Sequence, residues 1–152
     1  MLLNAPRQYG LTQQHKHLKE MKALTGLVNE PIFCPIVSDF YSGMLVTVPL
    51  FASDLAPGVT VQDIRALYRE KYCSRIVRYT DAESDGDGMM SAAALSGKDD
   101  MEITVGGNDR RILLMARYDN LGKGASGAAV ECLNLVLGVP ETTGLVLSSD
   151  RT

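Results

Sequence analysis

Apolar runs alternate with polar breaks along the chain in a way that predicts several strands. Two runs, "PIFCPIV" at 31–37 and "GMLVTVPLF" at 43–51, are rich in Val, Ile and Phe and are bounded by Pro and Gly. Further along, "SRIVRYT" at 74–80 predicts another strand. The segments at 101–105 and 110–118, "MEITV" and "RRILLMARY", are joined by "GGND" and therefore predict an antiparallel hairpin.

Helical spacing of apolar residues occurs in three places. A short helix is predicted at 18–24, ended by Gly26, and a last helix at 125–138, ended by Gly138 and Pro140. The apolar stripe of the last helix consists of Ala125, Ala128, Ala129, Cys132, Leu133 and Val136.

The middle helix has the clearest amphipathic pattern, within "PGVTVQDIRALYREKY" at 57–72. Thr60 and Asp63 have the spacing of a capping box at its start. One face carries Val61, Ile64, Leu67, Tyr68 and Tyr72. Because strands outnumber helices and the hairpin is antiparallel, the predicted class is α+β, with a mostly antiparallel mixed sheet covered by helices.

Composition and charge narrow the function classes. A length of 152 residues with 45% hydrophobic and 22% charged residues predicts a single domain, 1–152, with its own core. The net charge of −3 without a basic run argues against nucleic-acid binding. Since no apolar stretch approaches the ~20 residues of a membrane span and no signal-peptide pattern opens the chain, we expect a cytoplasmic protein without a membrane partner.

The cysteines Cys34, Cys73 and Cys132 are widely spaced and form no CxxC pair. A disulfide framework and a zinc ribbon are therefore both unexpected. We expect three buried thiols in a reducing cytoplasm.

One acidic segment, "DAESDGDG", begins like an EF-hand calcium loop at Asp81. Its twelfth position is Ala92, where calcium binding needs a bidentate Glu. A solvated polar loop is the better interpretation, and no metal site is expected.

Three glycines lie in "YDNLGKGASGAAV", near the predicted start of the last helix. Backbone N–H groups at a helix start attract anions, Gly122, Gly124 and Gly127 would let a ligand approach, and Lys123 adds a positive charge. The same small residues would equally serve close helix packing. The sequence leaves both interpretations open.

The two histidines of the chain, His15 and His17, come two residues apart at the edge of the first predicted helix, with Tyr9 six residues before the first. In an extended or turning segment both rings could reach one cleft, where imidazole can exchange protons near neutral pH. A metal site lacks a third ligand, whereas a pair of surface or capping histidines needs nothing further. These residues alone leave the surface interpretation ahead.

Several segments resemble one known family. "HKHLKEM" resembles the HxHxPE segment of the N-acetyl-γ-glutamyl-phosphate reductases of arginine biosynthesis, and "PIFCPIVSDFYSGMLVTVPL" resembles the following strand pair in their shorter type. "DNLGKGASGAAVECLNLVLGVPETTGL" resembles their C-terminal end. The resemblance runs from about Tyr9 to Leu145 and is carried by two separate motifs in the right order.

The resemblance implies an enzyme that reduces N-acetyl-γ-glutamyl phosphate to N-acetylglutamate semialdehyde with NADP as cofactor. A cysteine thiolate forms a thioester, which hydride then reduces. The implied fold is similar to that of glyceraldehyde-3-phosphate dehydrogenase: a Rossmann half followed by an α+β half for catalysis and dimerisation. This chain resembles the second half only, so we expect it to be an inactive fragment without the nucleophile, and a homo-oligomer. The helical region 120–138 is expected to pack on the missing half.

Roles for individual residues follow from the same resemblance. His17 resembles the residue that takes the thiol proton and later protonates the nascent aldehyde oxygen. His15 would face the anionic groups of the substrate, with Tyr9 as a hydrogen-bond partner. Asn120 resembles the asparagine that holds the nicotinamide carboxamide, and the cofactor edge would be lined by Gly122, Lys123 and Gly124.

Two positions depart from the family pattern. Lys19 stands where Pro is usual, which should cost rigidity in the first helical turn and not chemistry, and Asp99 stands where many members have Asn. Two other functions remain open: a domain that only dimerises, and a domain of the related aspartate-semialdehyde dehydrogenase class. The "HKH" pair and the "PETTGL" ending favour the reductase over that last class.

Overall fold

The computed structural model describes residues 5–81 and 85–148. The chain divides into two compact units, Met1–Phe40 and Tyr41–Thr152, called here the first and second unit. Each unit is described by itself.

The first unit is built around one short helix and one small antiparallel ladder. Helix α1 (Lys16–Thr25) ends at Gly26, which adopts the left-handed conformation with φ 72° and donates its N–H to Lys22 O. Strands β1 (Arg7–Gln8) and β2 (Ile36–Val37) pair antiparallel.

Two sequence predictions for this unit need correction. The strand predicted at 31–37 shrinks to the two residues of β2, because Pro31 and Pro35 have no N–H to give to a ladder. Helix α1 begins two residues earlier than predicted, at Lys16, because His15 caps it. His17 therefore lies inside the first helical turn.

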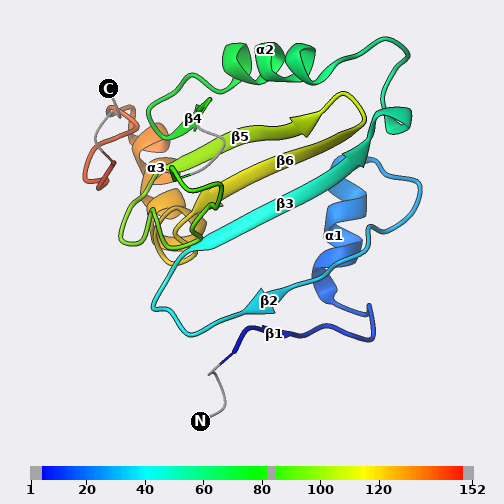
Figure 1. Ribbon diagram of the computed structural model, residues 1–152. Helices are drawn as coiled ribbons and strands as arrows, with labels where there is room; N and C mark the ends of the chain where they lie inside the picture. Colours follow the sequence, from blue (N-terminus) through cyan, green and yellow to red (C-terminus); the bar gives the residue numbers. More distant parts are fainter. Residues whose placement is uncertain (1–4, 82–84, 149–152) are drawn as a thin grey trace. The chain divides into compact units, whose positions relative to one another are not determined.

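The second unit contains a four-stranded sheet in the order β3-β6-β5-β4 (Figure 1). The central hairpin consists of β5 (Met101–Asn108) and β6 (Arg111–Tyr118), and β3 (Met44–Phe51) pairs antiparallel with β6. The outer strand β4 (Val77–Tyr79) is parallel to β5. The predicted α+β class with a mostly antiparallel mixed sheet is confirmed.

The hairpin turn differs slightly from the prediction, because β5 continues through "GGN" and turns at Asp109 and Arg110. Gly107 makes this continuation possible: its φ is 96°, and a Cβ there would lie 2.2 Å from Arg111 O.

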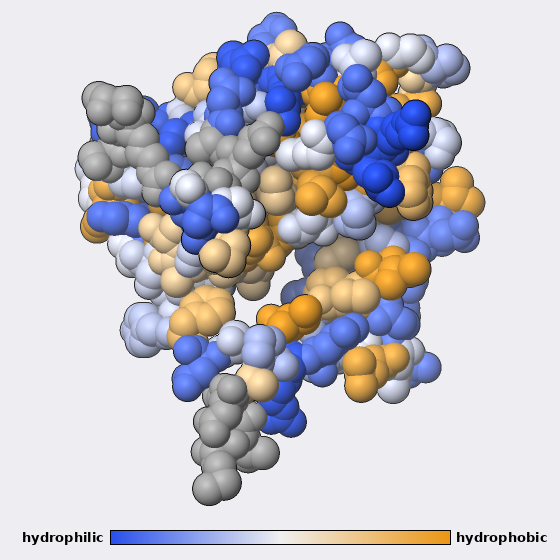
Figure 2. Space-filling view, viewed as in Figure 1, coloured by the Kyte–Doolittle hydropathy of each residue, from blue (hydrophilic) through white to orange (hydrophobic). Residues whose placement is uncertain are grey.

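Helix α2 (Val61–Lys71) covers one face of the sheet, as Figure 1 shows. The predicted capping box is confirmed, with Thr60 and Asp63 bonding each other's backbone N–H. Hydrophilic side chains dominate the surface over α2 in Figure 2, since its apolar side faces the sheet. The core between helix and sheet consists of Val61, Ile64, Val105 and Ile112, with Leu50, Leu55, Val59, Tyr68, Tyr79 and Leu114 packed around them.

The opposite face of the sheet carries a buried ionic network near β4. Glu102 accepts from Arg117 at 2.7 Å and from Arg78 at 2.6 Å, and Arg117 also pairs with Asp85 at 2.7 Å. Asp100, fully buried, pairs with Arg78. The acidic loop predicted to be solvated therefore contributes one of its carboxylates to this network; residues 82–84 of that loop lie outside the described part.

The last helical region begins with a π-helical turn, η2 (Gly122–Ser126), and continues as α3 (Gly127–Leu137), ended by left-handed Gly138. Much of the apolar surface of α3 is exposed: Leu133, Leu135, Val136 and Leu137 are all more than half accessible. A short 3-10 turn, η1 (Ala52–Asp54), follows β3. None of the described helices is long and apolar enough to cross a membrane.

The prediction of three buried cysteines is wrong, because Cys34, Cys73 and Cys132 are all free and exposed. Cys34 lies in the irregular segment before β2, and Cys73 follows the end of α2. Cys132 lies on the exposed side of α3, so its surroundings depend on what covers that helix.

Candidate active site

The histidine pair is positioned by the start of helix α1. His15 is the N-cap residue in extended conformation, and its Nδ1 accepts a hydrogen bond of 3.3 Å from the backbone N–H of His17. This bond requires an unprotonated Nδ1, so the proton of the neutral ring lies on Nε2. One histidine thus orients the backbone of the other.

The two imidazoles belong to a cluster of four rings. The His15 and His17 rings are 4.6 Å apart between centroids, and Phe33 lies 5.1 Å from His15 and 6.5 Å from His17. Tyr9 meets His15 edge-on at 6.2 Å. The structure therefore brings together Tyr9, His15 and His17; the contact of Tyr9 with His15 is between rings, in place of the expected hydrogen bond.

Gln13 ties this cluster together. Its side chain accepts from the N–H of Phe33 at 2.9 Å and donates to the carbonyl of the same residue at 2.7 Å. Its φ of 53° is unusual for a residue with a side chain. The two bonds to one peptide segment place Phe33 against His15 and compensate for the backbone strain.

The chemistry open to the two histidines differs. His15 uses Nδ1 to cap the helix and presents Nε2–H as a donor. The ring nitrogens of His17 make no hydrogen bond within the described part of the chain, and the side chain is exposed. The ring of His17 is therefore accessible to a ligand or to another side chain from outside the described residues.

In the second unit, Asn120 follows strand β6 and has one side of its amide fixed. Its Oδ1 accepts from the backbone N–H of Gly43 at 2.8 Å. Gly43 has a φ of 128°, and a Cβ there would lie 2.2 Å from Ala92 O, so only glycine fits. The Nδ2 group of Asn120 has no partner among the described residues and remains as a donor.

The buried carboxylate of Asp119 organises the backbone around Asn120. Its Oδ2 accepts from Ser42 Oγ at 2.7 Å and from the N–H of Gly97 at 2.5 Å. Its Oδ1 accepts from the N–H of Leu121 at 2.7 Å and of Gly122 at 3.2 Å. Burial, the largest influence, raises the pKa of Asp119, but these hydrogen bonds together outweigh it and leave the pKa lowered.

The three glycines of the last helical region have packing neighbours inside the protein. A Cβ on Gly122 would lie 2.4 Å from Lys98 O, and one on Gly127 would lie 2.4 Å from a carboxylate oxygen of Asp99. A Cβ on Gly124 would lie 3.2 Å from the Tyr118 ring. Close packing thus explains why glycine occupies these positions.

Lys123 forms an ion pair with Glu131 one turn into α3. Both side chains are largely buried, so the pair compensates the charge of the lysine. Glu131 therefore limits how strongly Lys123 can attract an anionic group.

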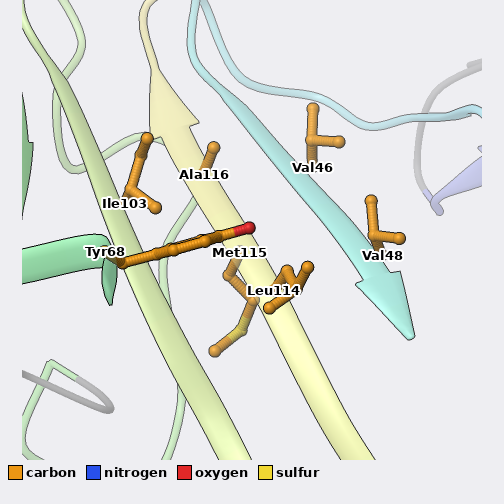
Figure 3. Close-up of a pocket in the computed structure, with 7 residues that line it drawn as sticks. All are labelled: Val46, Val48, Tyr68, Ile103, Leu114, Met115 and Ala116. Atoms are coloured by element: carbon orange, nitrogen blue, oxygen red, sulfur yellow. The ribbon is translucent and has the colours of Figure 1, made fainter. Parts of the chain in front are cut away.

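The pocket shown in Figure 3 is apolar and lies on the α2 side of the sheet. Tyr68 reaches from α2 across β5 toward β6 (Figure 3). The pocket is lined by Val46, Val48, Tyr68, Ile103, Leu114, Met115 and Ala116, and none of the predicted site residues is among them. Among residues 5–81 and 85–148, no group of three or more His, Cys, Asp or Glu is placed to hold a metal.

Sequence reasoning missed the residues that position the site. Asp119 had a usable signal, because an Asp side chain in a turn often accepts from the backbone N–H two residues further on. Gln13 and Ser42 had none: their partners are distant in the chain, and a positive φ at glutamine is not visible in a sequence.

Comparison with known proteins shows the family to which the chain belongs. The profile described as "Semialdehyde dehydrogenase, dimerisation domain" matches residues 2–120, and the chain belongs to this family. One relative, N-acetyl-gamma-glutamyl-phosphate reductase 2 of Nostoc sp. (strain PCC 7120 / SAG 25.82 / UTEX 2576), is 44% identical over 144 residues, which cover 90% of this chain and 45% of the relative.

A second relative, the N-acetyl-gamma-glutamyl-phosphate reductase of Sinorhizobium fredii (strain NBRC 101917 / NGR234), is 44% identical over 131 residues, covering 85% of this chain and 42% of the relative. The chain thus spans less than half the length of the curated relatives that it matches.

Proposed function

We propose that the chain is the catalytic and dimer-forming part of a reductase that converts N-acetyl-γ-glutamyl phosphate to N-acetylglutamate semialdehyde in arginine biosynthesis. The observation that carries this proposal is 44% identity over 90% of the chain to a protein named for that activity. The free cysteines are compatible with a reducing cytoplasm, where thiols stay unpaired.

The proposed cofactor is NADP, which supplies the hydride. Asn120 fits this group, because Oδ1 is occupied by Gly43 and Nδ2 is left to donate to the carboxamide oxygen. Gly122 and Gly124 would lie beside it, together with Lys123, whose ion pair with Glu131 makes it a weaker anion contact than an unpaired lysine. Most of the cofactor contacts belong to a Rossmann half, as does the nucleophilic cysteine.

His17 acts in this proposal as the general base for the cysteine thiol and later as the acid for the aldehyde oxygen. Support comes from its unoccupied ring nitrogens and from its fixed place in the first turn of α1. His15 and Tyr9 contact the substrate: the Nε2–H of His15 suits an anionic oxygen, since Nδ1 is already bonded to the backbone.

The N-terminal Rossmann half is also the proposed cover for α3. Val136, at 83% exposure, is among the most exposed apolar residues of the second unit. An apolar helix surface of this kind marks an interface, because water contact with so much apolar area is unfavourable.

Self-association is proposed through the sheet, on the face away from α2. The register of β3 with β6 puts Leu113 on that face, where it is 38% exposed, opposite Pro49. Val48, on the α2 face, is the matched control. We expect Leu113→Glu to convert the protein to monomers in sedimentation velocity while Val48→Glu leaves the assembly intact. The reverse pattern would move the interface to the other face.

The test of the function uses the chain joined to a Rossmann half that carries the family's cysteine. This protein should oxidise N-acetylglutamate semialdehyde with NADP in the presence of phosphate, the reverse of the biosynthetic direction. His17→Asn should lower kcat by roughly 10²–10⁴, the usual effect of removing a general acid–base. His15→Asn, the matched control, should act mainly on KM, because it removes a contact of equal strength in ground and transition state.

Three outcomes would each contradict one part of this proposal. No turnover in the joined protein, with intact assembly, would leave a module that only dimerises. Unchanged kcat in His17→Asn would remove the catalytic assignment. A micromolar dissociation constant for NADP with the chain alone, measured by calorimetry, would contradict the assignment of the cofactor site to a separate half.

A further inference from the structure

We infer that Asp119 is the positioning residue that sets the direction of the Asn120 amide, and through it the orientation of the nicotinamide. This inference rests on the proposed function for the identity of the ligand. It does not rest on it for the geometry.

Asp119 cannot itself be a ligand contact. Its side chain is 3% exposed, and each of its two oxygens accepts two hydrogen bonds. A carboxylate has about four acceptor positions, and all of them are used. The Asp119 carboxylate therefore acts by holding together the chain segments to which it is bonded.

Asp119 restrains Asn120 along the backbone. The bond from Leu121 N–H to Oδ1 spans the residue between them, so it closes a tight ring around the peptide of Asn120. The bond from Gly122 N–H fixes the next peptide and the beginning of η2. These bonds define where the Asn120 side chain leaves the chain.

The same carboxylate also restrains the partner of the Asn120 side chain. Ser42 donates to Asp119 Oδ2 at 2.7 Å and also contacts Ser96 Oγ at 2.7 Å, which holds the residue in place. The next residue, Gly43, donates its N–H to Asn120 Oδ1 at 2.8 Å. The backbone next to Asn120 and the segment that holds its Oδ1 are therefore both restrained by the Asp119 carboxylate.

A carboxylate suits this arrangement, because three of the four partners are backbone N–H groups, which can only donate, and they are shared between the two oxygens. In Asp119→Asn, one of the two acceptor oxygens would become an NH₂, which would face at least one of these backbone N–H groups. That N–H would lose its acceptor inside the protein, and the loop around Asn120 would lose part of its restraint.

The matched control is Asp100→Asn. Asp100 is an equally buried carboxylate, and it is held by Ser148 and Arg78 on β4, with no bond to residues 119–122. Both variants lose stability, but only one of them changes the surroundings of Asn120.

The first measurement needs no cofactor and uses NMR on this chain. Asp119→Asn should shift the Asn120 side-chain NH₂ resonances and speed the exchange of the Gly43 amide by about tenfold or more, the effect of losing a protecting hydrogen bond. Asp100→Asn should do neither. Equal effects of the two variants, or no effect of Asp119→Asn, would overturn the inference.

The second measurement is a double-mutant cycle in the joined enzyme. Asn120→Ala and Asp119→Asn should each raise KM for NADP by about tenfold, the equivalent of one hydrogen bond, with a smaller change in KM for the semialdehyde. In the Asn120→Ala background, Asp119→Asn should raise KM for NADP no further, because it acts through that amide. Additive effects would overturn the inference. If Asn120→Ala alone left KM for NADP unchanged, the proposed cofactor contact would fail instead, and the NMR result would still decide the positioning role.

Discussion

Gly127→Ala is expected to destabilise the second unit, although alanine is normally the better helix former. Gly127 has φ −61° and ψ −45°, which alanine adopts without strain. By helix propensity alone the substitution would stabilise the helix by about 1 kcal/mol. The new Cβ, however, would lie 2.4 Å from Asp99 Oδ1 and 2.9 Å from its Cβ and Cγ.

The size of this destabilisation depends on the interaction that Asp99 loses when the new Cβ displaces it. Its other oxygen accepts from the N–H of Val146 at 2.9 Å, so the side chain cannot move away without losing that bond. Breaking a hydrogen bond to a charged group costs about 1.5–3 kcal/mol, and forcing the contact instead costs about 1–3 kcal/mol as overpacking. After the gain of about 1 kcal/mol in helix propensity, we expect a net loss of about 0.5–2 kcal/mol if the bond breaks and of up to about 2 kcal/mol if the contact is forced.

Urea denaturation followed by circular dichroism measures this loss as a lower midpoint at unchanged slope. The control is the same substitution in an Asp99→Gly background, which removes the three nearest atoms that the new Cβ would meet. There, Gly127→Ala should be neutral or stabilising. The reasoning would be refuted if Gly127→Ala alone had the urea midpoint of the unsubstituted protein. It would also be refuted if Gly127→Ala lowered the midpoint equally with Asp99 and with Gly at position 99.

Three further predictions concern the capping box, acid and α3. Thr60→Ala should lower the unfolding free energy by about 1 kcal/mol in urea titrations, because the N–H of Asp63 loses its acceptor. Asp100 and Asp119 have pKa values lowered below 3.8, since hydrogen bonds outweigh the opposing effect of burial. Their stabilisation is complete above that ordinary value and is lost as pH falls through the lower folded pKa, so urea midpoints should be flat from pH 7 to 5 and decline below about pH 4. Val136→Glu should change the stability of this chain by less than about 0.5 kcal/mol and weaken its assembly with a Rossmann half in a pull-down titration.

The sequence predicted those parts of the fold whose signals are local. Helix α2 follows from apolar spacing and a capping box within a few residues, and the β5–β6 hairpin from two adjacent apolar runs. The parallel pairing of β4 with β5 was not predictable in detail, because it depends on a partner reached only after a long loop. The exposure of Cys132 was missed because helical spacing indicates an apolar face and does not indicate what covers it.

For the candidate site, too, the sequence indicated only some of the residues. The histidines and Asn120 were proposed as site residues from their residue types and from the resemblance to a family, and these roles stay predictions. The groups that hold them were not, since Gln13 and Ser42 act through bonds that span 20 and 77 residues. Long-range side-chain bonds leave no periodic trace in a sequence.

The strand order has a consequence for how the protein is made. Strands β3 and β4 lie at opposite edges of the sheet, and the later hairpin lies between them (Figure 1). A growing chain therefore contains β3 for some time before β6, its partner among the described strands, exists. Strand β3 ends at Phe51 and pairs with a strand that begins at Arg111, so roughly 60 residues must be added first, which takes about 3–12 s at usual rates of synthesis.

During that interval β3 is an unpaired apolar strand, rich in the residues that favour strand pairing. The hairpin, whose strands are neighbours in the chain, can close within microseconds once residue 118 has left the ribosome. Folding of the second unit is thus expected to be limited by synthesis and to begin at its C-terminal side. Nascent chains that end between residues 51 and 111 should be the ones that bind chaperones.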